Sequence, residues 1–386
     1  MRLFKEKLAW AAPLAVIAII ALFSVNLFAQ GNPQVRNLPV ALIINDEGAN
    51  VDAVSSAVQQ MSKGIDGEEP MLAFTNEQEA DIEGLFHDKK YYAALVVPEG
   101  YNDAVQHALE NNSPAALQVY INQGYNITGA NAAKAALNGL IEQLSNKYSE
   151  EFKAQLGDQK IDADQAAVLV KPIVSQEKIF NEVTPSTANG VAPTLMAVPA
   201  WVGALIGGFI LFLVTSNIYR KELLNRKQTL HLMGGQALFG IIIALFSGFT
   251  VATLGLIAGI NMPSYFLVGS FVSFAAFCFF LLVSGVTAWI GKPAITLFMV
   301  VMLLGMGVLM TPPEMLPDFF VNFIRPWVPI RFASEGLREI FYFGSGFYTG
   351  QSFNIILGIG VAGLTMYILS IFKPVRPKKK KVDHEA

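Results

Sequence analysis

Apolar stretches long enough to cross a membrane restrict the fold of this 386-residue sequence more than any other feature. The hydrocarbon core of a bilayer is about 30 Å thick, so a spanning helix needs about 20 apolar residues. One such stretch stands near the N-terminus and the others lie in the second half of the chain. They are Leu8–Ala29, Leu195–Ser216, Gln236–Gly259, Tyr265–Ile290, Ala294–Thr311 and Phe353–Phe372. The pattern predicts an α-helical polytopic membrane protein with six transmembrane helices in a one-plus-five arrangement.

The distribution of charge predicts the orientation of these helices. Six crossings place both termini on the same side, and the segments expected there are 1–7, 217–235, 291–293 and 373–386. These segments hold 14 basic residues and four acids. Cytoplasmic loops of membrane proteins carry an excess of lysine and arginine, so both termini are expected in the cytoplasm. The basic tail 373–386 is expected to contact anionic membrane lipid through Lys378–Lys381.

The first apolar stretch has two interpretations. Basic residues precede it, as they do in a cleavable signal peptide. However, it is 22 residues long, which exceeds the signal-peptide core of about 7 to 15 residues, and it lacks a small-residue cleavage motif. We therefore interpret residues 1–29 as a cytoplasmic N-terminus followed by an uncleaved transmembrane helix.

A polar insert, residues 30–194, separates the first two predicted spans and is expected to form an extracellular α/β domain. It holds ten basic and 22 acidic residues, a balance that argues against a nucleic-acid partner. The only cysteine, Cys278, falls in a predicted span, so a packed core must stabilise the insert without disulfides. Short apolar runs alternate with helical patterns along it. Strands are predicted at 38–44, 71–74, 91–97, 117–122 and 168–174, and helices at 51–61, 76–87, 99–110 and 128–156.

The sequence has no phosphate-binding loop, zinc-binding motif or nucleophile elbow, three motifs that are typical of enzymes. The nearest approach to a phosphate-binding loop, Gly291-Lys292-Pro293, lacks the required glycine spacing and the hydroxyl for magnesium. The four histidines form no zinc-binding motif, and no nucleophile elbow is present. We therefore predict a protein without catalytic residues, metal or cofactor of its own.

Several segments resemble one known family in their order along the chain. Residues 38–49 (Leu-Pro-Val-Ala-Leu-Ile-Ile-Asn-Asp-Glu-Gly-Ala) and 89–100 (Lys-Lys-Tyr-Tyr-Ala-Ala-Leu-Val-Val-Pro-Glu-Gly) resemble the outer domain of the YhgE/Pip-like (phage infection protein) group of type-2 ABC exporter permeases. Residues 311–317, continuing through 327–329 to 335–338, resemble the outer loop that precedes the last helix in that group. The insert is short for the group, so a generic exporter permease and a phage-infection protein are equal alternatives.

The resemblance implies a function and its partners. It implies a bacterial cell-membrane permease that works as a homodimer with a separate cytoplasmic ABC ATPase, which binds the ATP. Independently, the predicted spans 195–216, 236–259, 265–290, 294–311 and 353–372 contain no aspartate, glutamate, lysine, arginine or histidine, which argues against ion-coupled transport and suits export of a hydrophobic or amphipathic substrate. The alternative class is a non-transporting scaffold or receptor, including a phage attachment protein, that acts through its extracellular domain.

The segment 219–233, between the second and third spans, is the predicted ATPase-coupling loop. Its position resembles that of the coupling helix in the exporter family. Apolar residues at helical spacing can form one stripe, with basic residues facing water or lipid phosphates. The apolar set is Leu223, Leu224 and Leu230, and the basic set is Arg220, Lys221, Arg226 and Lys227. The alternative is a basic loop that only orients the protein.

The segment 312–352 is predicted to form re-entrant or interfacial helices that close the outer end of the pathway. It mixes aromatic and charged residues, a combination that is typical of the membrane interface. The candidate gate residues are Pro317, Trp327, Arg331, Glu335 and Arg338, and the last three are expected to pair at helical spacing. The alternative is interfacial anchoring without a gating role.

Two glycine pairs within the region 195–372 predict close helix packing. Glycines four residues apart on a membrane helix allow another helix to approach closely. The pairs are Gly203 with Gly207 and Gly255 with Gly259. They could pack helices within one subunit or join the two subunits of the homodimer that the resemblance implies.

Overall fold

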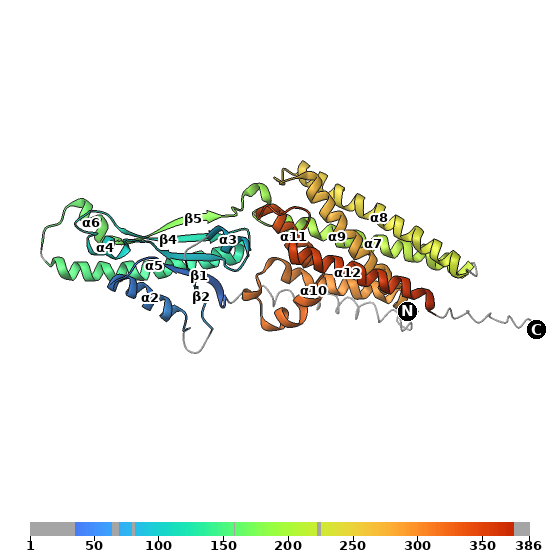
Figure 1. Ribbon diagram of the computed structural model, residues 1–386, viewed down its shortest axis with the longest axis horizontal. Helices are drawn as coiled ribbons and strands as arrows, with labels where there is room; N and C mark the ends of the chain where they lie inside the picture. Colours follow the sequence, from blue (N-terminus) through green and yellow to red (C-terminus); the bar gives the residue numbers. More distant parts are fainter. Residues whose placement is uncertain (1–34, 64–68, 79–81, 158, 222–224, 374–386) are drawn as a thin grey trace, which may run out of the picture. The chain divides into compact units, whose positions relative to one another are not determined.

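A computed structural model describes residues 35–63, 69–78, 82–157, 159–221 and 225–373 (Figure 1). The predicted first membrane helix, 8–29, and most of the basic tail therefore lie outside the described residues. The described chain divides into two units. The first contains the chain up to Pro193 together with Leu304–Trp327 and Arg338–Ser345, and the second contains the remainder.

A five-stranded sheet forms the centre of the first unit (Figure 1). Its strands are β1 (Leu38–Ile44), β2 (Leu72–Asn76), β3 (Ala93–Val97), β4 (Ala115–Asn122) and β5 (Ile173–Phe180). They lie in the order β2-β1-β3-β4-β5. β1 is parallel to β2 and β3, β4 is antiparallel to β3, and β5 is parallel to β4. Four of the five apolar runs predicted as strands thus fall on strands of one mixed sheet.

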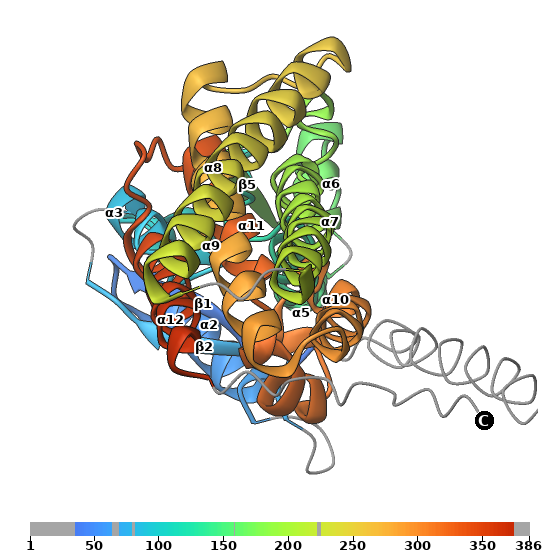
Figure 2. The same cartoon turned by 90° about the vertical axis from the view of Figure 1, so that its right-hand side faces the viewer.

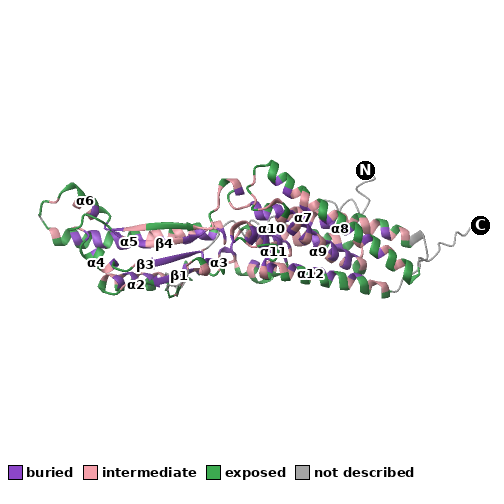
Figure 3. Cartoon of the chain, turned by 45° about the horizontal axis from the view of Figure 1, so that its top comes forward, coloured by how far each residue is buried: buried purple, intermediate pink, exposed green. Residues whose placement is uncertain are grey.

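Helices connect these strands and cover the sheet unequally. They are α2 (Ala49–Met61), α3 (Ile82–His87), α4 (Tyr101–Gln106), α5 (Ile127–Leu156) and α6 (Ala163–Val170). Alternate residues of β1, such as Val40, belong to the main core with α2, α4 and α5. The opposite residues, such as Ala41, pack against Phe86 of α3 in a smaller cluster. β3 is buried along its whole length, as Figure 3 shows. The predicted α/β architecture of this region is therefore confirmed.

Three predicted elements of this domain are wrong in their extent, and one of them, the helix predicted at 99–110, is limited to Tyr101–Gln106. The strand predicted at 168–174 is divided between the end of α6 and the start of β5, because Asp162 and Gln165 form a capping box that starts a helix there. The helix predicted at 76–87 begins at Ile82 in the described chain, because Asn76 continues β2 and pairs with Leu42 of β1. At 168–174 helix capping overrides an apolar run that resembles a strand, whereas at 76–87 strand pairing overrides a helical pattern.

Five long apolar helices follow the sheet domain. They are α7 (Ala192–Lys221), α8 (Arg226–Ile257), α9 (Tyr265–Ile290), α10 (Pro293–Met310) and α12 (Gly350–Leu369), which continues as the turn η6 (Ser370–Phe372).

 

By length and composition, each of these five helices is able to cross a membrane. These five candidate spans in the described chain agree with the last five predicted from the sequence. The division between the units passes through α10, whose residues from Leu304 onward belong to the first unit.

α9 is the central helix of the second unit. It packs against α8 and α12 (Figure 2). In the most apolar 18-residue segment of α9, 67% of the residues are buried, against 33% or less in the corresponding segments of the other four candidate spans. Glycines allow the close approach: a Cβ at Gly363 of α12 would meet the backbone of α9 at Leu282, and one at Gly240 of α8 would meet the ring of Phe280. α9 therefore acts as the core helix against which the others pack.

Short helical segments fill the region between α10 and α12. They are the 3₁₀ turn η3 (Pro313–Met315), the π-helical turn η4 (Phe320–Ile324), the 3₁₀ turn η5 (Arg325–Trp327) and α11 (Ile330–Tyr342). A further 3₁₀ turn, η2 (Pro185–Thr187), precedes α7. Residues 312–352 thus contain short helices, as predicted, whereas their relation to a membrane surface stays a prediction.

Candidate functional site

The predicted coupling segment consists of the ends of two long helices. α7 continues to Lys221, and α8 begins at Arg226 after Asn225, whose ψ of 168° is not helical. The side chains of Asn225 and Gln228 form a capping box that starts α8. The helical stripe expected for the coupling loop 219–233 is therefore interrupted at Asn225. The role of the segment in docking an ATPase stays a prediction.

The candidate coupling residues are distributed over this break. Leu223 and Leu224 lie outside the described residues, and Leu230 is exposed on α8. The guanidinium carbon of Arg226 lies 5.6 Å from the ring centroid of Phe372, just after α12. Lys227 is on the same first turn of α8 and is exposed. The basic residues that are described here therefore lie at helix ends.

A cavity of about 740 Å³ lies among these helix ends. The last turns of α7, α9 and α12 line it together with the first turns of α8 and with Lys373. Cavities of about 300 to 1,000 Å³ are typical of sites that bind small molecules. The walls combine the apolar side chains of Phe212, Met233 and Trp289 with hydroxyl and amide groups. The cavity therefore has the mixed lining that an amphipathic ligand requires.

Buried polar groups lie in the wall of this cavity. The hydroxyl of Tyr367 donates a 2.7 Å hydrogen bond to Oε1 of Gln236, and both residues are buried. Ser284 is 1% exposed, and its hydroxyl has no hydrogen-bond partner among the described residues. By contrast, the hydroxyl of Thr287 is bonded to the carbonyl oxygens of Val283 and Ser284 on its own helix. Ser284 and the amide nitrogen of Gln236 are thus the polar groups that a ligand could engage.

Lys373 supplies positive charge to the same cavity. Its ammonium donates hydrogen bonds to the carbonyl oxygens of Ala288, at 3.1 Å, and Trp289, at 2.6 Å. These carbonyls are at the C-terminal end of α9, where the helix dipole favours a cation. The indole of Trp289 donates to the carbonyl of Met366 on α12 at 2.8 Å. These bonds hold the ammonium beside the cavity and join the ends of α9 and α12.

Sequence reasoning missed this cavity, although part of its signal is visible in the sequence. Gln236 stands at the edge of a predicted apolar span, and Ser284 and Thr287 stand inside another. Any one of them is an ordinary residue in a membrane helix, since hydroxyl groups can bond to the preceding turn. Only the packing of four helices places them around one space.

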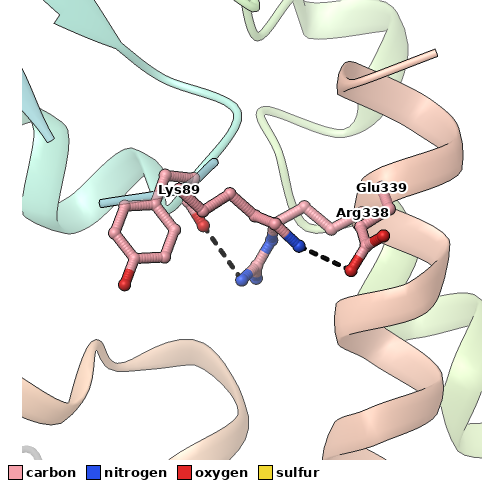
Figure 4. A network of polar contacts seen from close by, with 4 residues as sticks. Lys89, Arg338 and Glu339 are labelled. Carbon is pink, nitrogen blue, oxygen red and sulfur yellow. Dashed lines mark hydrogen bonds and ion pairs between the residues drawn. The ribbon is translucent and has the colours of Figure 1, made fainter. Parts of the chain in front are cut away.

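A second candidate site surrounds the predicted gate residue Arg338, within the first unit. Its Nη1 donates a 3.1 Å hydrogen bond to the carbonyl oxygen of Tyr125. The neighbouring Glu339 forms a 2.5 Å ion pair with Lys89 (Figure 4). The side chain of Glu339 is only 11% exposed, and that of Lys89 is 30% exposed. The end of α11 is thus bound to the sheet domain through two charged side chains.

Two tyrosines extend this network. The ring of Tyr92 stacks on that of Tyr125 at a centroid distance of 4.4 Å. Its hydroxyl donates a 2.9 Å hydrogen bond to Glu314 in η3. Burial raises the pKa of Tyr92 well above its usual value, so the phenol remains a proton donor to Glu314. A Cβ at Gly129 would meet the Tyr92 ring at 2.6 Å, so glycine is required for this close approach.

The other predicted gate residues have contacts of their own, and the expected pairing of Arg331, Glu335 and Arg338 stays a prediction. The carbonyl of Pro317 accepts a 2.8 Å hydrogen bond from the backbone of Phe320, and Trp327 is 76% exposed. Arg331 lies over the ring of Phe332 at 4.2 Å. Arg331 and Glu335 belong to the second unit and Arg338 to the first. Lys89 and Glu314, which sequence reasoning did not select, have no local pattern that distinguishes them from other surface charges.

The predicted glycine pairs have different surroundings. A Cβ at Gly207 of α7 would lie 2.9 Å from Ile243 of α8, and a Cβ at Gly203 of α7 would meet the hydroxyl of Ser247, which is also on α8. A Cβ at Gly255 would meet the end of Met196 on α7. Gly259 follows α8 with φ of +80° and has no atom within 4 Å of an added Cβ. Three of these glycines therefore lie where α7 and α8 meet, whereas Gly259 serves the turn after α8.

The part of the chain that the structure describes contains no group of three or more histidine, cysteine, aspartate or glutamate residues that could hold a metal ion. Five candidate spans and a separate α/β sheet domain define a multi-pass membrane protein with an added globular domain.

Comparison with known families identifies the kind of membrane protein. Residues 9–372 match the family described as ABC-2 family transporter protein, so the chain belongs to that family of ABC transporter permeases. A comparison with curated proteins found no match. Among solved structures, a domain assigned to an ABC type-2 transporter from Thermotoga maritima MSB8 is similar at 20% identity, covering 36% of this chain and 86% of that one, with a TM-score of 0.23.

Proposed function

We propose that this protein is the permease subunit of an ATP-driven exporter and moves a hydrophobic or amphipathic substrate out of the cell. The family match over residues 9–372 carries the proposal, because it extends from the first apolar stretch of the sequence to the end of the last one. The lack of aspartate, glutamate, lysine, arginine and histidine in the predicted spans from 195 onward supports it, since ion-coupled carriers usually need such groups within the membrane. Energy must then come from another polypeptide.

That polypeptide is a cytoplasmic ABC ATPase, which binds the ATP. The sequence of this chain has no phosphate-binding loop motif. The segment 219–233 is the proposed docking site, because it joins α7 and α8 and carries four basic residues. In this proposal the chain works as a homodimer, and its orientation follows from the positive-inside rule. Six helices then cross a bacterial cell membrane, with both termini in the cytoplasm and the sheet domain outside.

The finer assignment to the YhgE/Pip-like group is also a proposal. It depends on the resemblance of segments 38–49 and 89–100 to the outer domain of that group. These segments contain β1 and β3, two adjacent parallel strands of the sheet. A scaffold or receptor function, in which the outer domain acts without transport, is the competing proposal.

Reconstitution with an ATPase tests the export proposal. The full chain is co-expressed with the ABC ATPase encoded nearest to it and purified through a tag on this chain. We expect the ATPase to co-purify and its hydrolysis in proteoliposomes to depend on this chain. A double variant, Arg226→Glu with Lys227→Glu, should weaken co-purification at least tenfold. Lys292→Glu is the matched control, because it reverses charge at another helix end outside the segment 219–233.

Two outcomes would contradict the proposal. If no ABC ATPase associates with the chain while the protein is folded and inserted, the scaffold or receptor function is favoured. If the double variant and the control weaken association equally, general surface charge rather than the segment 219–233 determines docking.

A further inference from the structure

The cavity among the ends of α7, α8, α9 and α12 has features of a binding site that the transport proposal does not use. Among the described residues that line it, Lys373 is the one charged side chain and none is an acid. Its buried wall holds Ser284, whose hydroxyl has no partner among the described residues. A buried polar group without a partner is unfavourable, so such a group in a cavity wall indicates a ligand or ordered water. The other features decide which ligand fits.

The charge and the hydrogen-bonding groups select the head of the ligand. Lys373 uses two of its three N–H donors for the carbonyls of Ala288 and Trp289 and retains one. An ammonium held in this way attracts an anion such as a phosphodiester. The hydroxyl of Ser284, which has no partner among the described residues, and the amide of Gln236 add hydrogen-bonding groups to the same lining. An anionic headgroup that also carries hydroxyl groups satisfies both requirements.

The walls and the location select the rest of the ligand. Phe212, Met233 and Trp289 give the cavity an apolar lining beside its polar groups. The helices that form it are candidate membrane spans, and the cavity lies at the ends that bear Arg226, Lys227 and Lys373. Aromatic side chains at helix ends are typical of the depth of lipid headgroups. A volume of about 740 Å³ accommodates a headgroup and the first carbons of its chains, but not two complete acyl chains.

We propose that this cavity binds the headgroup of an anionic glycerophospholipid that carries hydroxyl groups, as phosphatidylglycerol does. The phosphate contacts Lys373, the glycerol hydroxyls contact Ser284 and Gln236, and the acyl chains extend along the apolar walls into the membrane. This site does not require an ATPase. Its test is therefore independent of the test of the export proposal, and either can fail alone.

Lipid titration of the purified full-length protein in detergent tests the site by native mass spectrometry. The probes are phosphatidylglycerol, phosphatidic acid and phosphatidylcholine with identical chains. We expect phosphatidylglycerol to bind most tightly, since phosphatidic acid lacks the glycerol hydroxyls and phosphatidylcholine has no net charge. Lys373→Gln should weaken phosphatidylglycerol binding about tenfold, the effect of one hydrogen bond to a charged group. Lys373→Arg should retain it. Lys292→Gln, which removes the same charge outside the cavity, should change it less than twofold.

A second variant examines the deep end of the cavity. Ser284→Ala removes a hydroxyl that makes no hydrogen bond to a described residue, so the variant should fold normally. It should reduce the preference for phosphatidylglycerol over phosphatidic acid by about threefold, the effect of one neutral hydrogen bond. Equal weakening by Lys373→Gln and Lys292→Gln would overturn the proposal in favour of general surface attraction. An unchanged lipid preference in Ser284→Ala would also overturn it, as would soluble glycerophosphoglycerol that binds as tightly as the lipid.

Discussion

Breaking the ion pair between Lys89 and Glu339 should loosen the attachment of α11 to the sheet domain. The pair is 2.5 Å long, and Glu339 loses most of its contact with water, with a side-chain exposure of 11%. Lys89 is 30% exposed, so solvent screens part of the attraction. Removing one partner from a buried pair costs about 3 to 5 kcal/mol, whereas an exposed pair contributes about 0 to 1 kcal/mol. For this intermediate case we expect a coupling free energy of about 1 to 2 kcal/mol.

A double-mutant cycle measures this coupling. The variants are Lys89→Met, Glu339→Gln and both together, in the full chain. Hydrogen–deuterium exchange of the amides in β3 and at the end of α11 reports the free energy of local opening. Each single variant should speed exchange in both segments. The double variant should cost less than the sum of the two, because neither charge is then left without its partner.

The neighbouring pair provides a matched control. Lys90 and Asp88 lie 3.7 Å apart with side chains that are 58% and 61% exposed. Lys90→Met should therefore change exchange by no more than about 0.5 kcal/mol. Additive effects of Lys89→Met and Glu339→Gln, or an equal effect of Lys90→Met, would refute the reasoning that burial makes the Lys89–Glu339 pair important.

Three further predictions concern the sheet domain and the membrane helices. Hydrogen bonds from Lys134 and Asn138 lower the pKa of Glu177, so the ionised carboxylate stabilises the fold above its unfolded pKa, and this stability is lost as pH falls through the folded pKa. Lys134→Met should therefore reduce the dependence of the unfolding free energy on pH in that range, and an unchanged pH profile would contradict this. Gly363→Ala should destabilise the helices by about 1 to 3 kcal/mol in thermal unfolding, because the methyl group meets the backbone of α9. Its control, Gly358→Ala on the same helix, has no atom within 4 Å and should be neutral or stabilising. Asn225→Ala should cost about 1 kcal/mol by removing the capping box of α8, measured as faster amide exchange in its first turn.

Local patterns predicted the elements whose boundaries depend on nearby residues. The strand at 38–44 and the helix at 128–156 agree closely with β1 and α5, because a β-rich run and an alanine-rich run without breakers each specify one conformation. The strand at 168–174 failed, because those residues are apolar in a pattern compatible with either structure. The capping box at Asp162 then determined a helix, and pairing with β4 placed the strand further along.

The candidate sites were less accessible to sequence reasoning. Arg338 was selected for its aromatic and charged surroundings, and one of its hydrogen bonds goes to the carbonyl of Tyr125, 213 residues earlier. Helical spacing indicated only partners on its own helix. Lys89 and Glu339 are 250 residues apart, and no local signal joins them. The cavity near Lys373 likewise requires residues from four helices.

The sequence by itself determined that this is a multi-pass membrane protein with an α/β domain, because hydrophobic length and periodicity are properties of continuous segments. Transfer of about 20 apolar residues into a bilayer is favourable whatever lies around them. Only the tertiary structure decided that α9 is the buried centre of its unit, that Gly203 and Gly207 face α8, and that Ser284 and Lys373 share one cavity. Those properties depend on contacts between helices, and apolar helices of similar composition carry little information about which neighbour each will meet.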